Sequence, residues 1–323
     1  MSECEEQQVG SQNIHDDDSQ SKCTKESDLS DTSRNIHIVT TAALPWMTGT
    51  AVNPLLRALY LQKSRTNNAK ITLMIPWVEN EQERKTVYGH NDVFSQGKAG
   101  RKEQEAFVRK WAEEKAGMVE ESQTLRIQFY VARYLEKMGS IVPLVDLCCL
   151  IPAQQADIAI LEEPEHLNWL ALPAFQRPGD KRRDDFLPTT DFGWTQKFNH
   201  VVGIVHTNYP EYVRSYGVRG SRRLSAKTIH GLNVLVCRAY CHRLIKLSAT
   251  LPVLAKYKET ICNVHGVRGD FLSDVTSHEL VEDPNAARVY FIGKVLWAKG
   301  FDFLLKCQYK YRQSTGEYFP IGM

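Results

Sequence analysis

The chain has 323 residues, of which 42% are hydrophobic and 10% aromatic, so it is long and apolar enough for one large or two medium globular domains. Its net charge of +2 is unevenly distributed, because residues 1–34 carry nine acidic and three basic residues, whereas the remainder carries 37 basic and 29 acidic ones. The basic remainder suits anionic partners such as phosphates or lipid headgroups, although an excess of this size also serves solubility alone. We expect no nucleic-acid partner, and the sequence predicts no oligomeric state.

The cysteines and the N-terminus exclude several classes of protein. The eight cysteines show no Cys-x-x-Cys spacing, so we expect reduced thiols and no metal site. No stretch reaches the roughly 18 apolar residues of a membrane span. The N-terminus has neither the cationic start and apolar core of a secretory signal nor the Arg-rich composition of a transit peptide. Residues 1–34 are polar and rich in Ser and Asp, and we expect a disordered acidic tail.

The first ordered unit is predicted to begin near residue 36. Residues 36–41 are largely β-branched and predict a strand, and a loop of small residues containing Gly49 and Thr50 follows. Asn53 can cap the next helix, with Pro54 in its first turn. A strand, a loop and a helix N-terminus in this order present free N–H groups to an anion.

The rest of the chain alternates predicted strands with predicted helices, which indicates an α/β fold with a parallel sheet. The predicted helix at 225–240 is amphipathic and follows several basic residues, so it either docks on anionic lipid or covers the sheet. A polar linker is predicted at 273–288, after which residues 289–305 begin a fresh strand, loop and helix. The other strands are predicted at 71–76, 126–130, 156–161, 201–205, 243–248 and 259–267, the other helices at about 103–116 and 211–216, and loops at 79–102 and 172–193.

Polar side chains follow two of these strands at their carboxyl ends, the edge at which open α/β sheets bind their ligands. His206, Thr207 and Asn208 follow the apolar run 201–205. His206 is either a ligand-contacting residue or a hydrogen-bonded cap of its strand. The polar groups after the strand at 156–161 form a general-base site, a sugar-hydroxyl clamp or merely a solvated loop. They are Glu162, Glu163, Glu165 and His166.

Several phrases of the sequence carry a resemblance to a known family. In these segments the chain resembles the retaining GT-B glycosyltransferases of family four. Within that family it closely resembles the plant digalactosyldiacylglycerol synthases. The resemblance spans roughly residues 35 to 306. The phrases are TTAALPW at 40–46, TGTAVNPL at 48–55, LEEPEHL at 161–167, GIVHTNY at 203–209, CNVHGV at 262–267 and IGK at 292–294.

The resemblance implies a galactosyltransferase with two Rossmann-like domains. Such an enzyme moves galactose from UDP-galactose to monogalactosyldiacylglycerol and forms digalactosyldiacylglycerol with retention of configuration. It implies a peripheral membrane protein on the cytosolic face of the chloroplast outer envelope, with a galactolipid acceptor and without a metal or other cofactor. The expected domains are an N-terminal Rossmann-like, acceptor-side domain at 35–272, a linker at 273–288 and the start of a nucleotide-sugar-binding domain at 289–323.

The resemblance also implies roles for individual residues. The departing diphosphate accumulates negative charge, which cations and a helix N-terminus stabilise. By resemblance, His206 is the catalytic residue beside the transferred sugar. Donor-diphosphate roles fall to Gly49, Thr50, Lys294 and Lys299, and acceptor or sugar-binding roles fall to Glu162, Glu163, His166, Thr207 and Asn208.

The sequence departs from the family after residue 306. The paired glutamates that grip the donor in the family's C-terminal domain have no counterpart here, so the resemblance predicts a fragment with little activity of its own. One alternative is a catalytically inactive N-terminal half that binds galactolipid or membrane as a module. Another is a nucleotide-sugar enzyme that acts on a different acceptor, such as sucrose or a glycan.

Overall fold

The main sheet of the protein is open and mostly parallel. The computed structural model describes residues 31–65, 70–89, 94–169, 193–216, 222–265, 289–291 and 300–322. Within these residues eight strands join in the order β4-β3-β2-β1-β5-β6-β7-β8, and only β4 runs antiparallel to its neighbour. The α/β fold predicted from the sequence is therefore confirmed. The strands are β1 (Asn35–Val39), β2 (Lys70–Val78), β3 (Arg126–Leu135), β4 (Ser140–Pro143), β5 (Ile158–Glu162), β6 (His200–Val205), β7 (Arg243–Lys246) and β8 (Glu259–Ile261).

The strand order reverses at β1, which pairs in parallel with β2 on one side and with β5 on the other. The chain runs outward from β1 through β2 and β3 to the edge strand β4, returns to β5, and runs outward again through β6, β7 and β8. In doubly wound folds, ligands bind at such a reversal, beyond the carboxyl ends of the strands. The ends of β1, β5 and β6 are therefore the expected place for a functional site.

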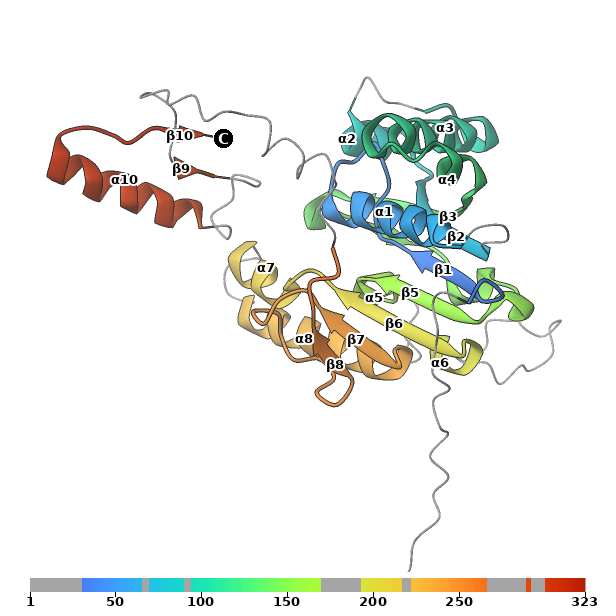
Figure 1. Cartoon of the computed structure of the whole chain (residues 1–323). Helices are drawn as coiled ribbons and strands as arrows, with labels where there is room; N and C mark the ends of the chain where they lie inside the picture. Colours follow the sequence, from blue (N-terminus) through green and yellow to red (C-terminus); the bar gives the residue numbers. More distant parts are fainter. Residues whose placement is uncertain are drawn as a thin grey trace, which may run out of the picture.

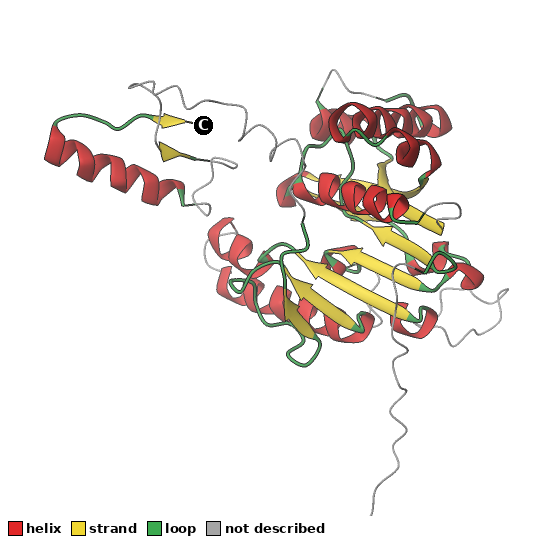
Figure 2. Cartoon of the chain, viewed as in Figure 1, coloured by secondary structure: helices red, strands yellow, loops and turns green. Residues whose placement is uncertain are grey.

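Helices cover both faces of the sheet (Figure 1 and Figure 2). Helices α1 and α3 share one apolar core with Ile158 and Ile160 of β5. Helices α5, α6 and α8 share the other core with Ala159 and Leu161. Successive residues of one strand thus pack against the helices on opposite faces of the sheet. The helices are α1 (Gly49–Lys63), α2 (Glu81–Tyr88), α3 (Gly97–Ala116), α4 (Val119–Thr124), α5 (Pro164–Leu167), α6 (Trp194–Lys197), α7 (Tyr209–Tyr216) and α8 (Arg222–Tyr240), with 3-10 turns η1 (Glu136–Met138), η2 (Cys148–Leu150) and η3 (Ala153–Gln155).

Helix α1 begins earlier than the sequence predicts. It starts at Gly49, so Pro54 lies inside the helix and Asn53 is not its cap. Pro54 has no N–H to donate to the carbonyl of Thr50, four residues before it. The hydroxyl of the fully buried Thr40 donates to this carbonyl instead. This replacement bond explains how the helix accommodates the proline.

The prediction of a loop at residues 79–102 is wrong over much of this range. Helix α2 occupies part of it, and α3 begins at Gly97. The buried residues of α2 are Arg84 and Tyr88. The Arg84 guanidinium lies 4.7 Å from the centre of the Trp77 ring. Because the buried face of this helix depends on an arginine, its sequence lacks the apolar period that indicates a helix.

Residues 289–322 contain a small unit of their own. Strand β9 (Val289–Tyr290) pairs in parallel with β10 (Ile321–Gly322), and α10 (Phe301–Thr315) lies between them in sequence. A strand and a helix are therefore present where the sequence predicts them, whereas β10 was not predicted. The predicted linker at 273–288 and most of the predicted loop at 172–193 lie outside the described residues. Among the described helices, none has the length and apolar composition needed to cross a membrane.

Candidate functional site

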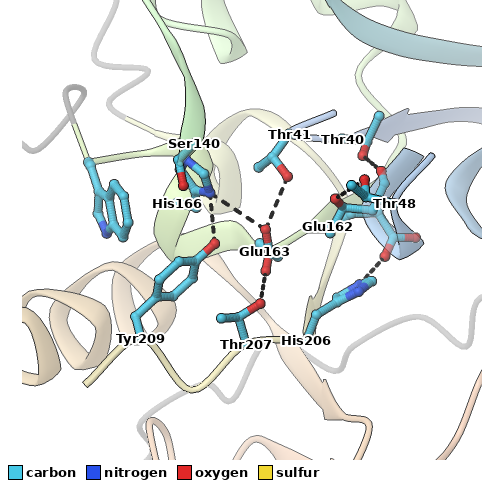
Figure 3. Close-up of polar contacts among 12 residues, drawn as sticks. Thr40, Thr41, Thr48, Ser140, Glu162, Glu163, His166, His206, Thr207 and Tyr209 are labelled. Atoms are coloured by element: carbon cyan, nitrogen blue, oxygen red, sulfur yellow. Dashed lines mark hydrogen bonds and ion pairs between the residues drawn. The ribbon is translucent and has the colours of Figure 1, made fainter. Parts of the chain in front are cut away.

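Two clusters of polar side chains lie at the carboxyl ends of β1, β5 and β6 (Figure 3). Successive residues of a strand point to opposite faces, and this alternation continues just past the ends of β5 and β6. Glu162 and His206 therefore meet on the α1 side of the sheet, while Glu163 and Thr207 meet on the other side. We call these groups the Glu162 cluster (Arg57, Glu162, His206 and His265) and the Glu163 cluster (Thr41, Glu163, His166 and Thr207).

Glu162 is fully buried and accepts hydrogen bonds from two side chains. Its Oε1 accepts from Nε of Arg57 at 2.9 Å, and its Oε2 lies 2.6 Å from Nε2 of His206. Burial raises the pKa of Glu162, but the hydrogen bond from His206 and the charge of Arg57 outweigh burial and hold this pKa below its usual value. The carboxylate is therefore ionised, and protein groups occupy both of its oxygens.

A second histidine packs against His206. The ring centre of His265 lies 4.9 Å from that of His206, with an angle of 55° between the rings. Burial lowers the pKa of His265 to about 4, so this ring is neutral at neutral pH. Arg57 Nη1 donates to the adjacent carbonyl of Val264 at 3.3 Å. These contacts connect the loop after β8 to α1 and to the end of β6.

Glu163 is the centre of the other cluster and has a left-handed backbone conformation, with φ of 63°. Its N–H donates to the carbonyl of Ile204 at 2.8 Å. Its carboxylate accepts hydrogen bonds from the Thr41 and Thr207 hydroxyls and lies 3.5 Å from Nδ1 of His166. Burial raises the pKa of Glu163, but the hydrogen bond and charge of His166 outweigh burial, and the pKa falls to about 2. Left-handed non-glycine residues are costly and concentrate at functional sites.

His166 connects the Glu163 cluster to two aromatic side chains. Its Nδ1 lies 2.8 Å from the hydroxyl of Tyr209, and its ring stacks on Trp169 with 4.4 Å between the ring centres. Tyr209 meets Trp169 edge to face at 4.9 Å. Trp169 Nε1 in turn donates to Oδ1 of Asn233 at 3.2 Å. The end of β5 is thereby held against α7 and α8.

Glu165 differs from the two preceding glutamates. It is fully buried, and among the described residues neither of its carboxyl oxygens has a hydrogen-bond partner. Burial, with a smaller contribution from the charge of Glu163, raises the pKa of Glu165 well above its usual value. Burial in the folded chain therefore favours the protonated form of this carboxyl group. A buried carboxyl group whose protonated form is favoured does not suit a general base, which is one of the alternatives that the sequence leaves open for this stretch.

Gly49, Thr50 and Asn208, three further residues with predicted roles, lie outside both clusters. Gly49 and Thr50 form the first turn of α1, where the Thr50 hydroxyl lies 3.1 Å from that of Thr48. Asn208 Oδ1 accepts from the N–H of Glu211 at 3.2 Å, so its side chain caps α7. The sugar-binding role of Asn208 and the diphosphate roles of Gly49 and Thr50 stay predictions. Lys294 and Lys299 lie outside the described residues.

Sequence reasoning missed Arg57 and His265. Arg57 precedes Glu162 by 105 residues, and no local pattern connects them. The available signal was general, since a buried carboxylate needs a cation or several donors beside it. His265 fell within the strand predicted at 259–267, but β8 ends at Ile261 and leaves His265 in a loop. Within the part of the chain that the structure describes, no group of three or more His, Cys, Asp or Glu side chains is arranged to hold a metal ion.

Comparison with known proteins identifies relatives of the chain. No protein-family model matches it. Digalactosyldiacylglycerol synthase 1 of Lotus japonicus is 42% identical over 290 residues, which cover 88% of this chain and 33% of that protein. The synthase 1 of Glycine max is 42% identical over 287 residues, or 87% and 32% of the two chains. Digalactosyldiacylglycerol synthase 2 of Arabidopsis thaliana is 39% identical over 288 residues, or 88% and 54%.

These matches cover most of this chain but only part of each relative. The chain spans about a third of the length of the synthases 1 and about half of the length of the synthase 2. All three names include the word chloroplastic. The chain is thus similar in sequence to the digalactosyldiacylglycerol synthases over most of its own length, as its motifs indicate.

Proposed function

We propose that this chain supplies one side of the active site of a galactosyltransferase that makes digalactosyldiacylglycerol. The observation that supports this most is the position of His206, which an ionised and buried carboxylate holds at the strand reversal of an α/β sheet. The names of the relatives give the class of product, since each is a digalactosyldiacylglycerol synthase. The acceptor is then monogalactosyldiacylglycerol, and the donor is UDP-galactose.

The proposed reaction exchanges one bond at the anomeric carbon of galactose. The bond to the β-phosphate oxygen of UDP breaks, and a bond to a hydroxyl oxygen of the acceptor galactose forms. The acceptor proton passes to the departing diphosphate, so UDP leaves and no further reactant is needed. Attack from the face that UDP leaves retains the configuration. His206 lies beside the transferred sugar in this scheme.

The charge that develops on UDP requires positive groups. We assign this role to the N-terminal turn of α1, which contains Gly49 and Thr50, together with Lys294 and Lys299. Both oxygens of Glu162 already accept hydrogen bonds from protein groups, so this residue acts on the sugar only through His206. Glu163 likewise acts through Thr207 and His166.

The location of the protein follows from the same resemblance. Its relatives are named chloroplastic. We propose that this chain works as a peripheral protein on the cytosolic face of the plastid outer envelope, where a galactolipid acceptor is embedded in the membrane.

The proposed transfer is testable in a chimera. Residues 35–306 of this chain replace the matching residues of the Arabidopsis synthase 2, and the chimera receives labelled UDP-galactose and vesicles that contain monogalactosyldiacylglycerol. We expect label in digalactosyldiacylglycerol. Label in a soluble acceptor such as sucrose, with none in lipid, contradicts the proposal. Vesicle binding without transfer, while the parent synthase is active, indicates a lipid-binding module instead.

A further inference from the structure

We propose that Glu162 and Arg57 form a positioning pair that fixes the His206 ring with a proton on Nε2, so that, whenever the ring is neutral, Nδ1 is the nitrogen that accepts a hydrogen bond from a sugar hydroxyl. The hydroxyl ligand rests on the proposed function. The position of the proton rests on the hydrogen bonds and the ionised state of Glu162, and it is testable without any activity.

The arrangement of donors around Glu162 determines the proton position. Arg57 can only donate, and its Nε donates to Oε1 of Glu162 at 2.9 Å. The other oxygen, Oε2, lies 2.6 Å from Nε2 of His206. An ionised carboxylate can only accept, so the proton of this short contact belongs to Nε2 of His206. In a neutral imidazole, Nδ1 then carries the lone pair.

The surroundings hold the His206 ring in one orientation. The Glu162 side chain is completely buried, and the His206 side chain is only 8% exposed. The His265 ring packs on it at 4.9 Å. Arg57 is held by Glu162 and also by the Val264 carbonyl. Because the partners of Glu162 are fixed on both sides, the carboxylate cannot turn away from His206. Precise orientation of a ring nitrogen in this way is what an orienting carboxylate contributes to catalytic histidines.

Replacement of Glu162 by Gln gives a sharp expectation. Arg57 has no acceptor atom, so the amide oxygen of the new side chain must face Arg57. The amide NH₂ then faces Nε2 of His206 and donates to it. His206 must give up its Nε2 proton and carry the proton on Nδ1 instead. The substitution therefore preserves shape and reverses the tautomer.

The first experiment measures the tautomer in the 323-residue chain labelled with ¹⁵N-histidine. Long-range ¹H–¹⁵N spectra are recorded at about pH 9, above the ordinary histidine pKa of about 6.5, and His206→Gln identifies the signal. We expect Nε2–H in the wild type, Nδ1–H in Glu162→Gln, and a return to Nε2–H in Arg57→Leu/Glu162→Gln, where the amide is free to turn. Nδ1–H in the wild type overturns the proposal, even if no variant folds. An unchanged tautomer in a folded Glu162→Gln chain also overturns it.

The second experiment measures the catalytic consequence in the chimera. Glu162→Gln should lower kcat for digalactolipid formation by about 100-fold or more, because Nδ1–H cannot accept the hydroxyl. The Arg57→Leu/Glu162→Gln variant should regain part of this loss, which a merely structural role of Glu162 does not predict. A normal kcat in a variant with the reversed tautomer contradicts the role of Nδ1. If the unsubstituted chimera makes no digalactolipid while the tautomers are as expected, the proposed function is contradicted and the positioning pair is not.

Discussion

The side-chain hydroxyl of Thr40 donates a hydrogen bond to the backbone carbonyl of Thr50. In an uninterrupted helix the N–H of residue 54 would donate to this carbonyl, but Pro54 has no N–H. Thr40 follows β1 directly, whereas Thr50 lies in the first turn of α1. The Thr40 carbonyl also accepts from the Tyr130 hydroxyl at 2.6 Å. Thr40 thus connects the end of the first strand both to the first turn of α1 and to β3.

Thr40→Val should destabilise the protein by about 1–3 kcal/mol, because it leaves the carbonyl of Thr50 without a donor. Pro54→Ala restores an N–H at the helical position, so the same substitution at Thr40 should cost much less in a Pro54→Ala background. Urea unfolding of the two single variants and the double variant measures this coupling. Additive effects of the two substitutions would show that the Thr50 carbonyl does not connect them.

The contribution of Glu163 to the free energy of unfolding should depend on pH. Its pKa is lowered to about 2 in the folded chain, from the ordinary glutamate value of 4.5. The ionised form is favoured by folding, so this contribution is complete above about pH 4.5 and disappears as the pH falls toward 2. Glu163→Gln should therefore cost on the order of 3 kcal/mol at neutral pH and progressively less in acid. Unfolding curves between neutral pH and about pH 3 test this, and a constant difference would argue against it.

Glu165 should show the opposite pH dependence. Its pKa in the folded chain is raised well above 4.5, so above that pH the unfolded chain loses a proton that the folded chain retains. Wild-type stability then falls with rising pH, by at most about 1.4 kcal/mol per pH unit from this group. Glu165→Gln removes this loss and should unfold at a higher temperature than the wild type at about pH 8, with a smaller advantage near pH 5. A Glu165→Gln variant that is less stable at both pH values would mean that the carboxyl group is not neutral.

Gly203 in β6 should not tolerate a side chain. A Cβ atom there would lie 2.7 Å from Leu244 Cδ2 and from Pro164 Cγ, and 2.8 Å from Cys241 Sγ. Gly203→Ala should therefore cost about 1–3 kcal/mol of stability. The matched control is Gly231→Ala in α8, where a Cβ meets nothing within 4 Å and the change should be neutral or stabilising by up to about 1 kcal/mol. Chemical denaturation of both variants measures the contrast, and equal effects would contradict it.

The position of the two polar clusters at the carboxyl ends of the strands could be predicted from the sequence, because β-branched runs that end in polar residues indicate parallel strands and the edge at which they end. The β-branched runs before Glu162 and His206 are strands β5 and β6, and both end at this edge. The direct contact of Glu162 with His206 could not be predicted, because it depends on the register between β5 and β6, in which Glu162 pairs with Ile204. The alternation of side chains then brings His206, two residues further on, to the same face.

Contacts between distant residues and polar buried surfaces were not predictable. Arg57 reaches Glu162 across 105 residues, and only the folded layers bring α1 over the end of β5. Helix α2 was missed because Arg84 occupies the position at which an apolar residue is expected. The different environments of Glu163 and Glu165 were equally hidden, since an exposed or buried position after a strand cannot be distinguished from the run of acidic residues alone.

The role of His206 in galactosyl transfer is tested most directly by the initial rate at which the chimera with residues 35–306 of this chain converts monogalactosyldiacylglycerol to digalactosyldiacylglycerol. If the imidazole lies beside the transferred sugar as proposed, His206→Ala should reduce kcat/KM by about 100-fold or more while the chimera stays folded. An unchanged rate in the folded His206→Ala chimera would contradict the assignment of this site.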